Sequence, residues 1–332
     1  MSKVDFNKLF EGFSNIKAGV IGDVMLDIYW WGHVERISPE APVPVVALDK
    51  KEHRIGGAGN VALNLAALGA QVSILSVMGD DDNGHILTDL FNEHHINTNW
   101  VAKQASRITT AKTRIISRNQ QMMRLDAEIT RDLSIDDENA LLEKVRQYIV
   151  NERPQVIIFE DYNKGVLTER IIKEVTALCK QHGVITTVDP KRKNFFSYQG
   201  VDIFKPNLKE VKDGLNLLIE DVNLVTLNDI HHQLQKKLQH AISFITLSEK
   251  GVFYQENSDS KIIPSHLRNI ADVSGAGDTV IAVASLIYAA TKRIDLMAEV
   301  ANIAGGLVCE EVGTAAVDKD RLLHECKLLL QA

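Results

Sequence analysis

The chain has 332 residues, a length that suits one α/β domain with an appendage. Hydrophobic residues make up 45% and charged residues 24%, and the net charge of −7 gives no general attraction to nucleic acid or to an anionic membrane. Because the N-terminus lacks a secretion signal and no apolar stretch could span a bilayer, we expect a cytoplasmic protein without nucleic-acid or membrane partners.

Short apolar runs alternate with amphipathic patterns along most of the chain. The apolar runs predict buried strands at 18–21, 72–77, 156–159, 184–188, 203–204 and 242–247. Helical periodicity is clearest at 133–150, 168–182 and 227–238. Buried strands that alternate with helices indicate a parallel sheet covered on both faces, so the sequence predicts a doubly wound α/β fold.

Two stretches interrupt this alternation. Residues 29–54 hold three of the seven prolines (Pro39, Pro42 and Pro44) and a strand-like run at 43–48. Residues 107–126 are rich in β-branched and basic side chains. Neither stretch fits a crossover helix, so we expect a small β-sheet that projects from the main domain. The edges of such a sheet need covering, and pairing of two copies in a homodimer would cover them.

A late glycine segment carries the strongest chemical signal. Gly275, Ala276 and Gly277 lead through Asp278 into an apolar helical run at 280–288. Small residues let the backbone approach an anion, and the first N–H groups of the helix point at it. A carboxylate repels phosphate, so Asp278 is better explained as a base that accepts the proton of an attacking hydroxyl. Taken alone, a glycine turn with an Asp favoured by the helix dipole explains the segment equally well.

An early glycine segment, Gly56-Gly57-Ala58-Gly59-Asn60, precedes a predicted helix at 61–68. It does not follow the first strand, which argues against a dinucleotide fingerprint and a dehydrogenase. Close backbone approach and the Asn60 amide would suit the hydroxyls of a sugar. A capped helix start, with Asn60 near the N-cap, is the alternative.

Together, the two glycine segments resemble the signatures of the ribokinase-like (PfkB) carbohydrate kinase family, and the similarity runs along essentially the whole chain. The resemblance implies a single kinase domain over 1–332, with a lid formed by about 29–54 and 107–126. It implies Asp278 as the general base and the backbone of Gly275, Ala276 and Gly277 as an anion hole. The residues expected to bind the sugar are Asp27, Gly56, Gly57 and Asn60.

The same resemblance implies a nucleotide site for ATP with Mg²⁺. Asn207 and Glu210 match the family's Asn-x-x-Glu motif, in which the Glu acts on the metal through water. Ser248 and Gly251 lie where the ribose and adenine are held, and Asn302 lies in the late helix that walls the adenine pocket. Some relatives also bind a monovalent cation near the position of Asp272.

Within the family, the chain most closely resembles the kinases of D-glycero-β-D-manno-heptose 7-phosphate. The shared residues lie at 22–27, 36–45, 117–121, 161–165 and 189–191. The resemblance implies phosphorylation of the anomeric hydroxyl to give heptose 1,7-bisphosphate for ADP-heptose and lipopolysaccharide synthesis. Many such kinases are fused to an adenylyltransferase, which we do not expect in this chain. Ser274 replaces a common Thr, and Glu160 stands where a small residue often precedes Asp161.

A sugar phosphate also requires a second anion site. Asn119 and Gln120 are amides on the predicted lid that suit sugar hydroxyls, and Lys191, after a strand end, is the best basic candidate. The other basic candidates for this anion site are Arg107, Lys112, Arg114, Arg118, Arg124, Arg192 and Lys193. For each of them, a place on a solvated basic face is the alternative. A kinase for fructose 1-phosphate or ribose, and a sugar-binding regulator without catalysis, stay open as other functions.

Cysteine and histidine spacings do not predict a metal centre. Cys179, Cys309 and Cys326 are too scattered for a disulfide framework or a zinc knuckle, and the first two lie in apolar helical patterns typical of buried thiols. The histidine pairs at 94–95 and 231–232 point to different faces of a helix, so we expect surface positions.

Overall fold

The computed structural model describes residues 4–118, 120–219, 221–266, 268–311 and 313–330. An eight-stranded sheet, in the order β14-β13-β12-β11-β10-β9-β1-β4, forms its centre. Six neighbouring strands are parallel: β1 (Lys17–Gly22), β4 (Gln71–Leu75), β9 (Val156–Glu160), β10 (Ile185–Asp189), β11 (Ile203–Phe204) and β12 (Ile242–Thr246). The antiparallel strands β13 (Val252–Glu256) and β14 (Asp259–Ile263) complete one edge. The predicted doubly wound α/β sheet is therefore confirmed.

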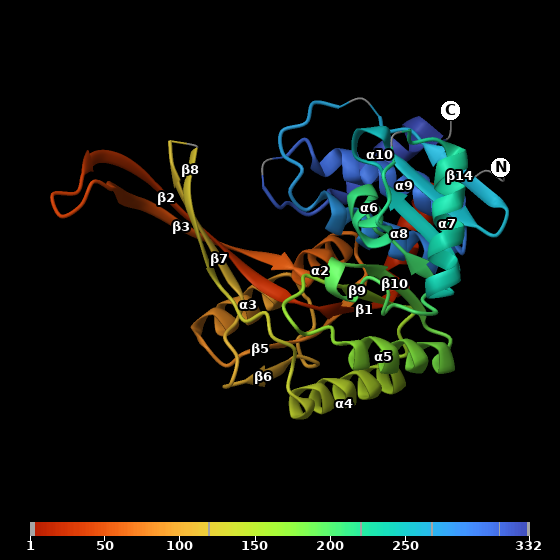
Figure 1. Ribbon diagram of the computed structural model, residues 1–332, viewed down its shortest axis with the longest axis horizontal. Coiled ribbons are helices and arrows are strands. Elements are labelled where there is room, and N and C mark those ends of the chain that lie inside the picture. The colour runs from red at the N-terminus through yellow and green to blue at the C-terminus, as the bar shows by residue number, and fades with distance from the viewer. Residues whose placement is uncertain (1–3, 119, 220, 267, 312, 331–332) are drawn as a thin grey trace.

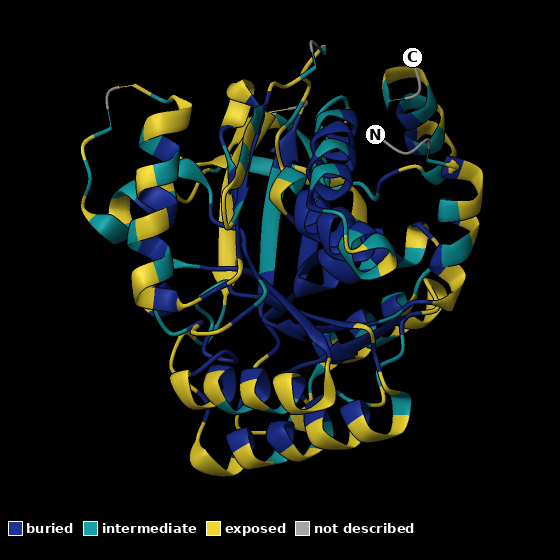
Figure 2. Cartoon of the chain, turned by 90° about the vertical axis from the view of Figure 1, so that its right-hand side faces the viewer, coloured by how far each residue is buried: buried dark blue, intermediate teal, exposed yellow. Residues whose placement is uncertain are grey.

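Helices cover both faces of this sheet and bury its central strands, which Figure 2 shows in dark blue. One apolar core lies under α1 (Phe6–Gly12), α2 (Ala58–Ala67), α3 (Asp82–Glu93), α8 (Ala276–Thr291), α9 (Ile294–Val308) and α10 (Lys319–Leu330). A second core lies under α4 (Ile135–Glu152), α5 (Glu169–His182), α6 (Leu208–Leu215) and α7 (Leu224–Leu238). The helical turns η1 (Phe13–Asn15), η2 (Arg192–Asn194) and η3 (Ser248–Lys250) lie in connections. Because both faces are covered, the central strands are mostly apolar rather than alternating.

The run at 72–77 was predicted as one strand, and this prediction is wrong at its end. β4 stops at Leu75, and β5 (Val77–Gly79) pairs instead with β6 (Ala102–Gln104) in a separate two-stranded sheet. Ser76, between them, donates its hydroxyl to the Gly22 carbonyl at 2.7 Å. This buried bond stands where a continued strand would have extended the ladder with β1.

The predicted small sheet is present and projects far from the body of the molecule (Figure 1). It contains β2 (Val24–Ile37), β3 (Pro44–Gly57), β7 (Ala111–Ser117) and β8 (Gln120–Ala127), in the order β3-β2-β7-β8. β2 and β3 are longer than predicted, since they run without a break from the buried core to the exposed tip. The four strands are called the lid below.

Two expectations about single side chains need correction. His231 is not on the surface but 1% exposed, because it shares the inner face of α7 with Leu227 and Leu234. Its ring contacts the Ser243 hydroxyl at 2.9 Å, and the buried His240 contacts the same hydroxyl at 2.6 Å. Among the cysteines, Cys309 is only partly buried because it lies at the end of α9. Across the described ranges, no helix has the length and apolar character needed to cross a membrane.

Candidate active site

Asp278, in the first turn of α8, lies at the meeting point of three distant segments. Its Oδ2 accepts a hydrogen bond from Asn60 Nδ2 at 2.7 Å, and its Oδ1 accepts one from the Tyr162 hydroxyl at 2.8 Å. Asn60 belongs to the first turn of α2, and Tyr162 follows the end of β9. The side chain of Asp278 is 6% exposed. Two donors on opposite oxygens therefore hold a buried carboxylate in one orientation.

Burial also sets the acidity of this carboxylate. The pKa of Asp278 is raised to about 6, chiefly by loss of solvent and in smaller part by the nearby charge of Asp189, while the hydrogen bonds from Asn60 and Tyr162 lower it. A carboxylate with a pKa close to the working pH combines ionisation at neutral pH with useful basicity. Asp278 is thus suited chemically to accept a proton from a bound hydroxyl.

The backbone before Asp278 presents free donors. Gly275 caps α8 with a φ of 79°, in the left-handed region that favours glycine. Ala276 donates its N–H to the Val273 carbonyl at 3.3 Å. The amides of Gly275 and Gly277 have no backbone acceptor among the residues the structure describes. Free amides at the start of a 16-residue helix form a place for an anion.

A pair of asparagines fixes α2 against α8. Asn64 lies one turn after Asn60 and donates to its carbonyl at 2.9 Å. The Asn64 side-chain oxygen accepts from the Thr279 hydroxyl at 3.1 Å and from the Val317 N–H at 3.0 Å. Since Thr279 adjoins Asp278, this second contact fixes the distance between the helices, and Asn60 is held within reach of Asp278.

The glycines before α2 are explained by close approach. Asp27, buried in β2, accepts a hydrogen bond from Arg114 of β7 at 2.6 Å. A Cβ on Gly56 would lie 2.4 Å from Asp27 Oδ2, and a Cβ on Gly57 would lie 2.4 Å from the Asp23 carbonyl oxygen. Gly57 also has a φ of 60°. The predicted sugar-binding residues Asp27, Gly56 and Gly57 therefore come together at the base of the lid.

Tyr162 is a site residue to which the sequence-based reasoning gave no role. Two cations lie within reach of its ring, with Lys112 Nζ 5.7 Å and Lys191 Nζ 5.6 Å from the ring centroid. Burial lowers the pKa of Lys112, although Asp27 raises it, and its ammonium has no hydrogen bond within the described part of the chain. One signal could have found Tyr162: polar residues at the carboxyl end of a buried parallel strand line ligand sites.

Asn207 and Glu210 form a capping box at the start of α6. Asn207 Oδ1 accepts the Glu210 N–H, and Glu210 Oε2 accepts the Asn207 N–H, both at 2.8 Å. Glu210 Oε1 accepts from Lys191 Nζ at 3.0 Å, and Lys191 also lies 3.5 Å from Asp189. Lys191 thus contacts the motif predicted for the nucleotide rather than standing free for a sugar phosphate.

The three remaining nucleotide candidates lie near one another. Gly251 follows η3 with a φ of 94°, and a Cβ there would lie 2.0 Å from the Ile263 carbonyl oxygen. Ser248 accepts the Gly251 N–H at 3.1 Å. Asn302, buried in α9, donates to the Pro264 carbonyl at 2.9 Å. Asn207 forms a bridge with Thr246, so this group and the capping box share the carboxyl end of β12.

Of the two predicted lid amides, the structure describes Gln120, which is not brought to Asp278. Asn119 lies outside the described residues. In the strand register of the lid, Asp27 of β2 lies opposite Lys112 of β7. Gly32 of β2 lies opposite Ser117 of β7, and Ser117 in turn lies opposite Gln120 of β8. Five strand residues at about 3.3 Å each separate these levels by roughly 17 Å. Gln120 is exposed and does not reach the site within one chain.

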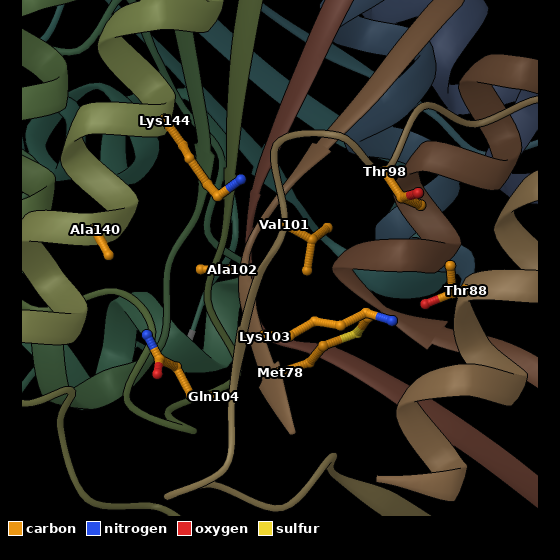
Figure 3. Close-up of a pocket in the computed structure, with 9 residues that line it drawn as sticks. All are labelled: Met78, Thr88, Thr98, Val101, Ala102, Lys103, Gln104, Ala140 and Lys144. Atoms are coloured by element: carbon orange, nitrogen blue, oxygen red, sulfur yellow. The ribbon is translucent and has the colours of Figure 1, made fainter. Parts of the chain in front are cut away.

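Most other basic candidates already have partners. Arg107 donates to three backbone carbonyls in two segments, those of Ile129 and Arg131 and that of Lys164, the last at 2.7 Å. Arg124 pairs with Asp126 and Lys193 with Asp132, while Arg118 and Arg192 are exposed. A cavity of about 360 Å³ between β5, β6, α3 and α4 is lined by none of the predicted site residues (Figure 3).

Comparison with known proteins shows the class to which this arrangement belongs. Residues 16–321 match the pfkB family carbohydrate kinase, and the chain belongs to this family of sugar kinases. Escherichia coli phosphofructokinase-2 in complex with potassium has a TM-score of 0.76 at 16% identity and covers 96% of this chain and 100% of its own. Arabidopsis thaliana ribokinase, complexed with ribose and ATP, has a TM-score of 0.72 at 17% identity and covers 93% and 98%. The fold is ribokinase-like.

Curated relatives share more of their sequence with this chain than these solved structures do. The bifunctional protein HldE of Geobacter sulfurreducens is 38% identical over 96% of this chain and 64% of its own length. The HldE of Sulfurimonas denitrificans is 39% identical over 90% of this chain and 61% of its own length. The chain therefore spans less than two thirds of these relatives.

Proposed function

We propose that this sugar kinase transfers the γ-phosphate of ATP to the anomeric hydroxyl of D-glycero-β-D-manno-heptose 7-phosphate, to give heptose 1,7-bisphosphate for ADP-heptose and lipopolysaccharide synthesis. The similarity to HldE over most of the chain supports the substrate. The observation that carries the chemistry is Asp278, a buried carboxylate with a pKa of about 6 beside free amides at a helix N-terminus.

In this mechanism Asp278 accepts the proton of the attacking hydroxyl while Asn60 and Tyr162 hold its two oxygens. The amides of Gly275 and Gly277, with Ala276 between them, stabilise the transferring phosphoryl group. Asp27 binds sugar hydroxyls at the base of the lid and keeps Arg114 in place. Closure of the lid over the sugar would exclude water and suppress hydrolysis of ATP.

The nucleotide would lie at Asn207, Ser248, Gly251 and Asn302, along the carboxyl ends of the strands. Magnesium carried by ATP would neutralise phosphate charge as it develops. Glu210 could hold the magnesium through a bridging water. Its two carboxylate oxygens each accept one hydrogen bond, and each keeps a further lone pair. A monovalent cation near Asp272 is a further proposal, prompted by the potassium in the phosphofructokinase-2 complex.

Lys112 is our first candidate for the 7-phosphate. Its ammonium is half-buried, has no hydrogen bond among the described residues and lies beside Tyr162, which contacts Asp278. Lys191, expected from the sequence for this role, contacts Glu210 and remains the second candidate. A phosphate on Lys112 would neutralise a cation that burial destabilises.

We also propose a homodimer formed through the lid and a cytoplasmic location. The strands β3 and β8 are free edges in the described chain. Exposed apolar side chains lie on the lid strands and in the turn between β2 and β3, where Val43 stands; those on the strands are Ile37, Leu48, Met122, Met123 and Leu125. Light scattering at assay concentration tests this idea, and a monomer would contradict it. We further propose that residues 1–332 act as one kinase domain.

The substrate is tested by ADP release with heptose 7-phosphate, fructose 1-phosphate and ribose. Turnover with heptose 7-phosphate alone supports the proposal, turnover with another sugar reassigns the substrate, and turnover with none indicates a regulator. In the active case, Asp278→Asn is expected to lower kcat by about 10²–10⁴. A variant with nearly full kcat would refute Asp278 as the base.

A further inference from the structure

Two buried carboxyl groups lie side by side beneath the catalytic candidate. Glu160 ends β9 and Asp189 ends β10, and the two residues are register partners in the parallel ladder. Neighbouring strands lie about 4.8 Å apart, and paired residues point to the same face of the sheet. Glu160 is 0% exposed and Asp189 is 4% exposed. A Cβ on Gly277 would lie 3.6 Å from Asp189 Oδ2, so the pair adjoins the start of α8.

Cationic partners are divided unevenly between these two groups. Asp189 Oδ2 contacts Lys205 Nζ at 2.8 Å, and its Oδ1 lies 3.5 Å from Lys191 Nζ. Lys205 is itself only 2% exposed. By contrast, neither carboxyl oxygen of Glu160 has a hydrogen-bond partner among the described residues. A buried charge without a partner is strongly unfavourable, so the negative charge belongs on Asp189.

We propose that Glu160 carries a proton in the resting enzyme, and that this neutral carboxyl limits the negative charge beneath the anion site so that ATP can bind. Glu160 is thus a positioning residue, since it acts through the charge of the site and does not touch the substrates. The effect on ATP binding deepens the proposed function and rests on it. The state of the proton itself is independent of the reaction.

The charged and titratable groups around Glu160 support this distribution. Asp189 of β10, Asp278 of α8, Lys191 and Lys205 face it, and the hydroxyls of Tyr162 and Tyr198 lie within range of its charge. Burial, followed by the charges of Asp189 and Asp278, raises the pKa of Glu160 well above its ordinary value. Burial acts the same way on Asp189, but Lys191 and Lys205 outweigh it and hold its pKa below the ordinary value.

Ionisation of Glu160 would change the balance of charge at the site. Asp189, Asp278 and Glu160 would then be three carboxylates beside two lysines, of which Lys191 also pairs with Glu210, next to the place proposed for the γ-phosphate. Like charges in a buried site repel an incoming phosphate.

The first test is the stability of Glu160→Gln, which keeps the shape and removes the ionisation. A carboxyl whose pKa is raised on folding stabilises the protein only at low pH, and that contribution is lost as the pH rises above its ordinary value of 4.5. The Tm of the variant relative to the wild type is therefore expected to rise by a few degrees between pH 5 and pH 8. A relative Tm that stays constant or falls over this range would overturn the proposal.

Glu138→Gln is the matched control. Glu138 is similarly buried at 7% exposure, but its carboxylate is paired with Thr168 and Arg170. Glu138→Gln removes a paired charge, so the Tm of this variant relative to the wild type is not expected to rise with pH. If Glu160→Gln fails to fold, ¹³C NMR of the wild type with labelled glutamate decides the matter. One carboxyl signal that stays protonated at pH 7 supports the proposal, and titration of every signal below pH 6 refutes it.

The second test measures the binding of ATP by calorimetry, under conditions without turnover. Above the pKa of Glu160, the Kd of the wild type for ATP is expected to rise with pH, by up to about tenfold per unit if only the protonated form binds. In Glu160→Gln this alkaline rise should be absent. An equal rise in both proteins would show that Glu160 does not govern the charge of the site. If no sugar is phosphorylated, the proposed substrate fails while both of these tests remain decisive.

Discussion

The hydroxyl of Tyr162 offers a direct test of how the base is tuned. Tyr162→Phe removes the hydrogen bond to Asp278 Oδ1 and leaves the one from Asn60 in place. A hydrogen bond to a charged group contributes about 1.5–3 kcal/mol, and 1.36 kcal/mol corresponds to one pKa unit. Because part of this loss is regained by reorientation of the site, we expect the pKa of Asp278 to rise by about one unit from its value of about 6.

In the proposed mechanism Asp278 accepts a proton only when it is ionised, so the activity is expected to fall as the pH drops through its pKa. The acidic limb of the kcat/KM profile is therefore expected to move upward by about one pH unit in Tyr162→Phe. At pH 6 the ionised fraction falls from about one half to about one tenth, a loss of about fivefold that largely disappears at pH 8. The assay is ADP release across pH 5–9 at low substrate concentration.

Tyr198→Phe is the control for this experiment. Tyr198 is also buried and donates its hydroxyl to a different carboxylate, Asp161, at 2.8 Å. It makes no contact with Asp278, so its loss should lower stability without moving the acidic limb. An unmoved limb in Tyr162→Phe, or an equal movement in both variants, would refute the assignment of Tyr162 to the base.

Three further changes test other contacts. Because Lys191 contacts Glu210, Lys191→Ala should raise the KM for ATP at least as much as that for the sugar phosphate, and an increase for the sugar alone would return it to the phosphate site. Gly56→Ala should raise the KM for the sugar at least tenfold, because its Cβ would lie 2.4 Å from Asp27 Oδ2, and unchanged steady-state kinetics would contradict that clash. Burial lowers the pKa of His231 to about 4 and of His240 to about 3, so their unfolded forms bind protons first as the pH falls below about 6.5. Urea unfolding should therefore show a loss of about 2 kcal/mol between pH 7 and 5.5 that is absent in the doubly Gln-substituted protein.

Local patterns were sufficient for the fold class and for the two glycine segments. Strands buried on both faces must be apolar throughout, so β1, β9 and β12 were visible as runs in the sequence. The lid was visible because prolines and β-branched residues stand where a crossover helix was expected. Asp278 could be proposed because a carboxylate after Gly-Ala-Gly is unusual for simple anion binding. Each of these inferences uses neighbours within a few positions.

Contacts between distant segments could be found only in the tertiary structure. Tyr162 meets Asp278 across 116 residues and Asn60 meets it across 218, and no spacing rule predicts such pairs. The uneven sharing of lysines between Glu160 and Asp189 depends on strand order in the sheet. Sequence by itself thus determined which groups could act chemically. Folding decided which of them are buried together, because desolvation and partner charges depend on the surroundings of each side chain in three dimensions.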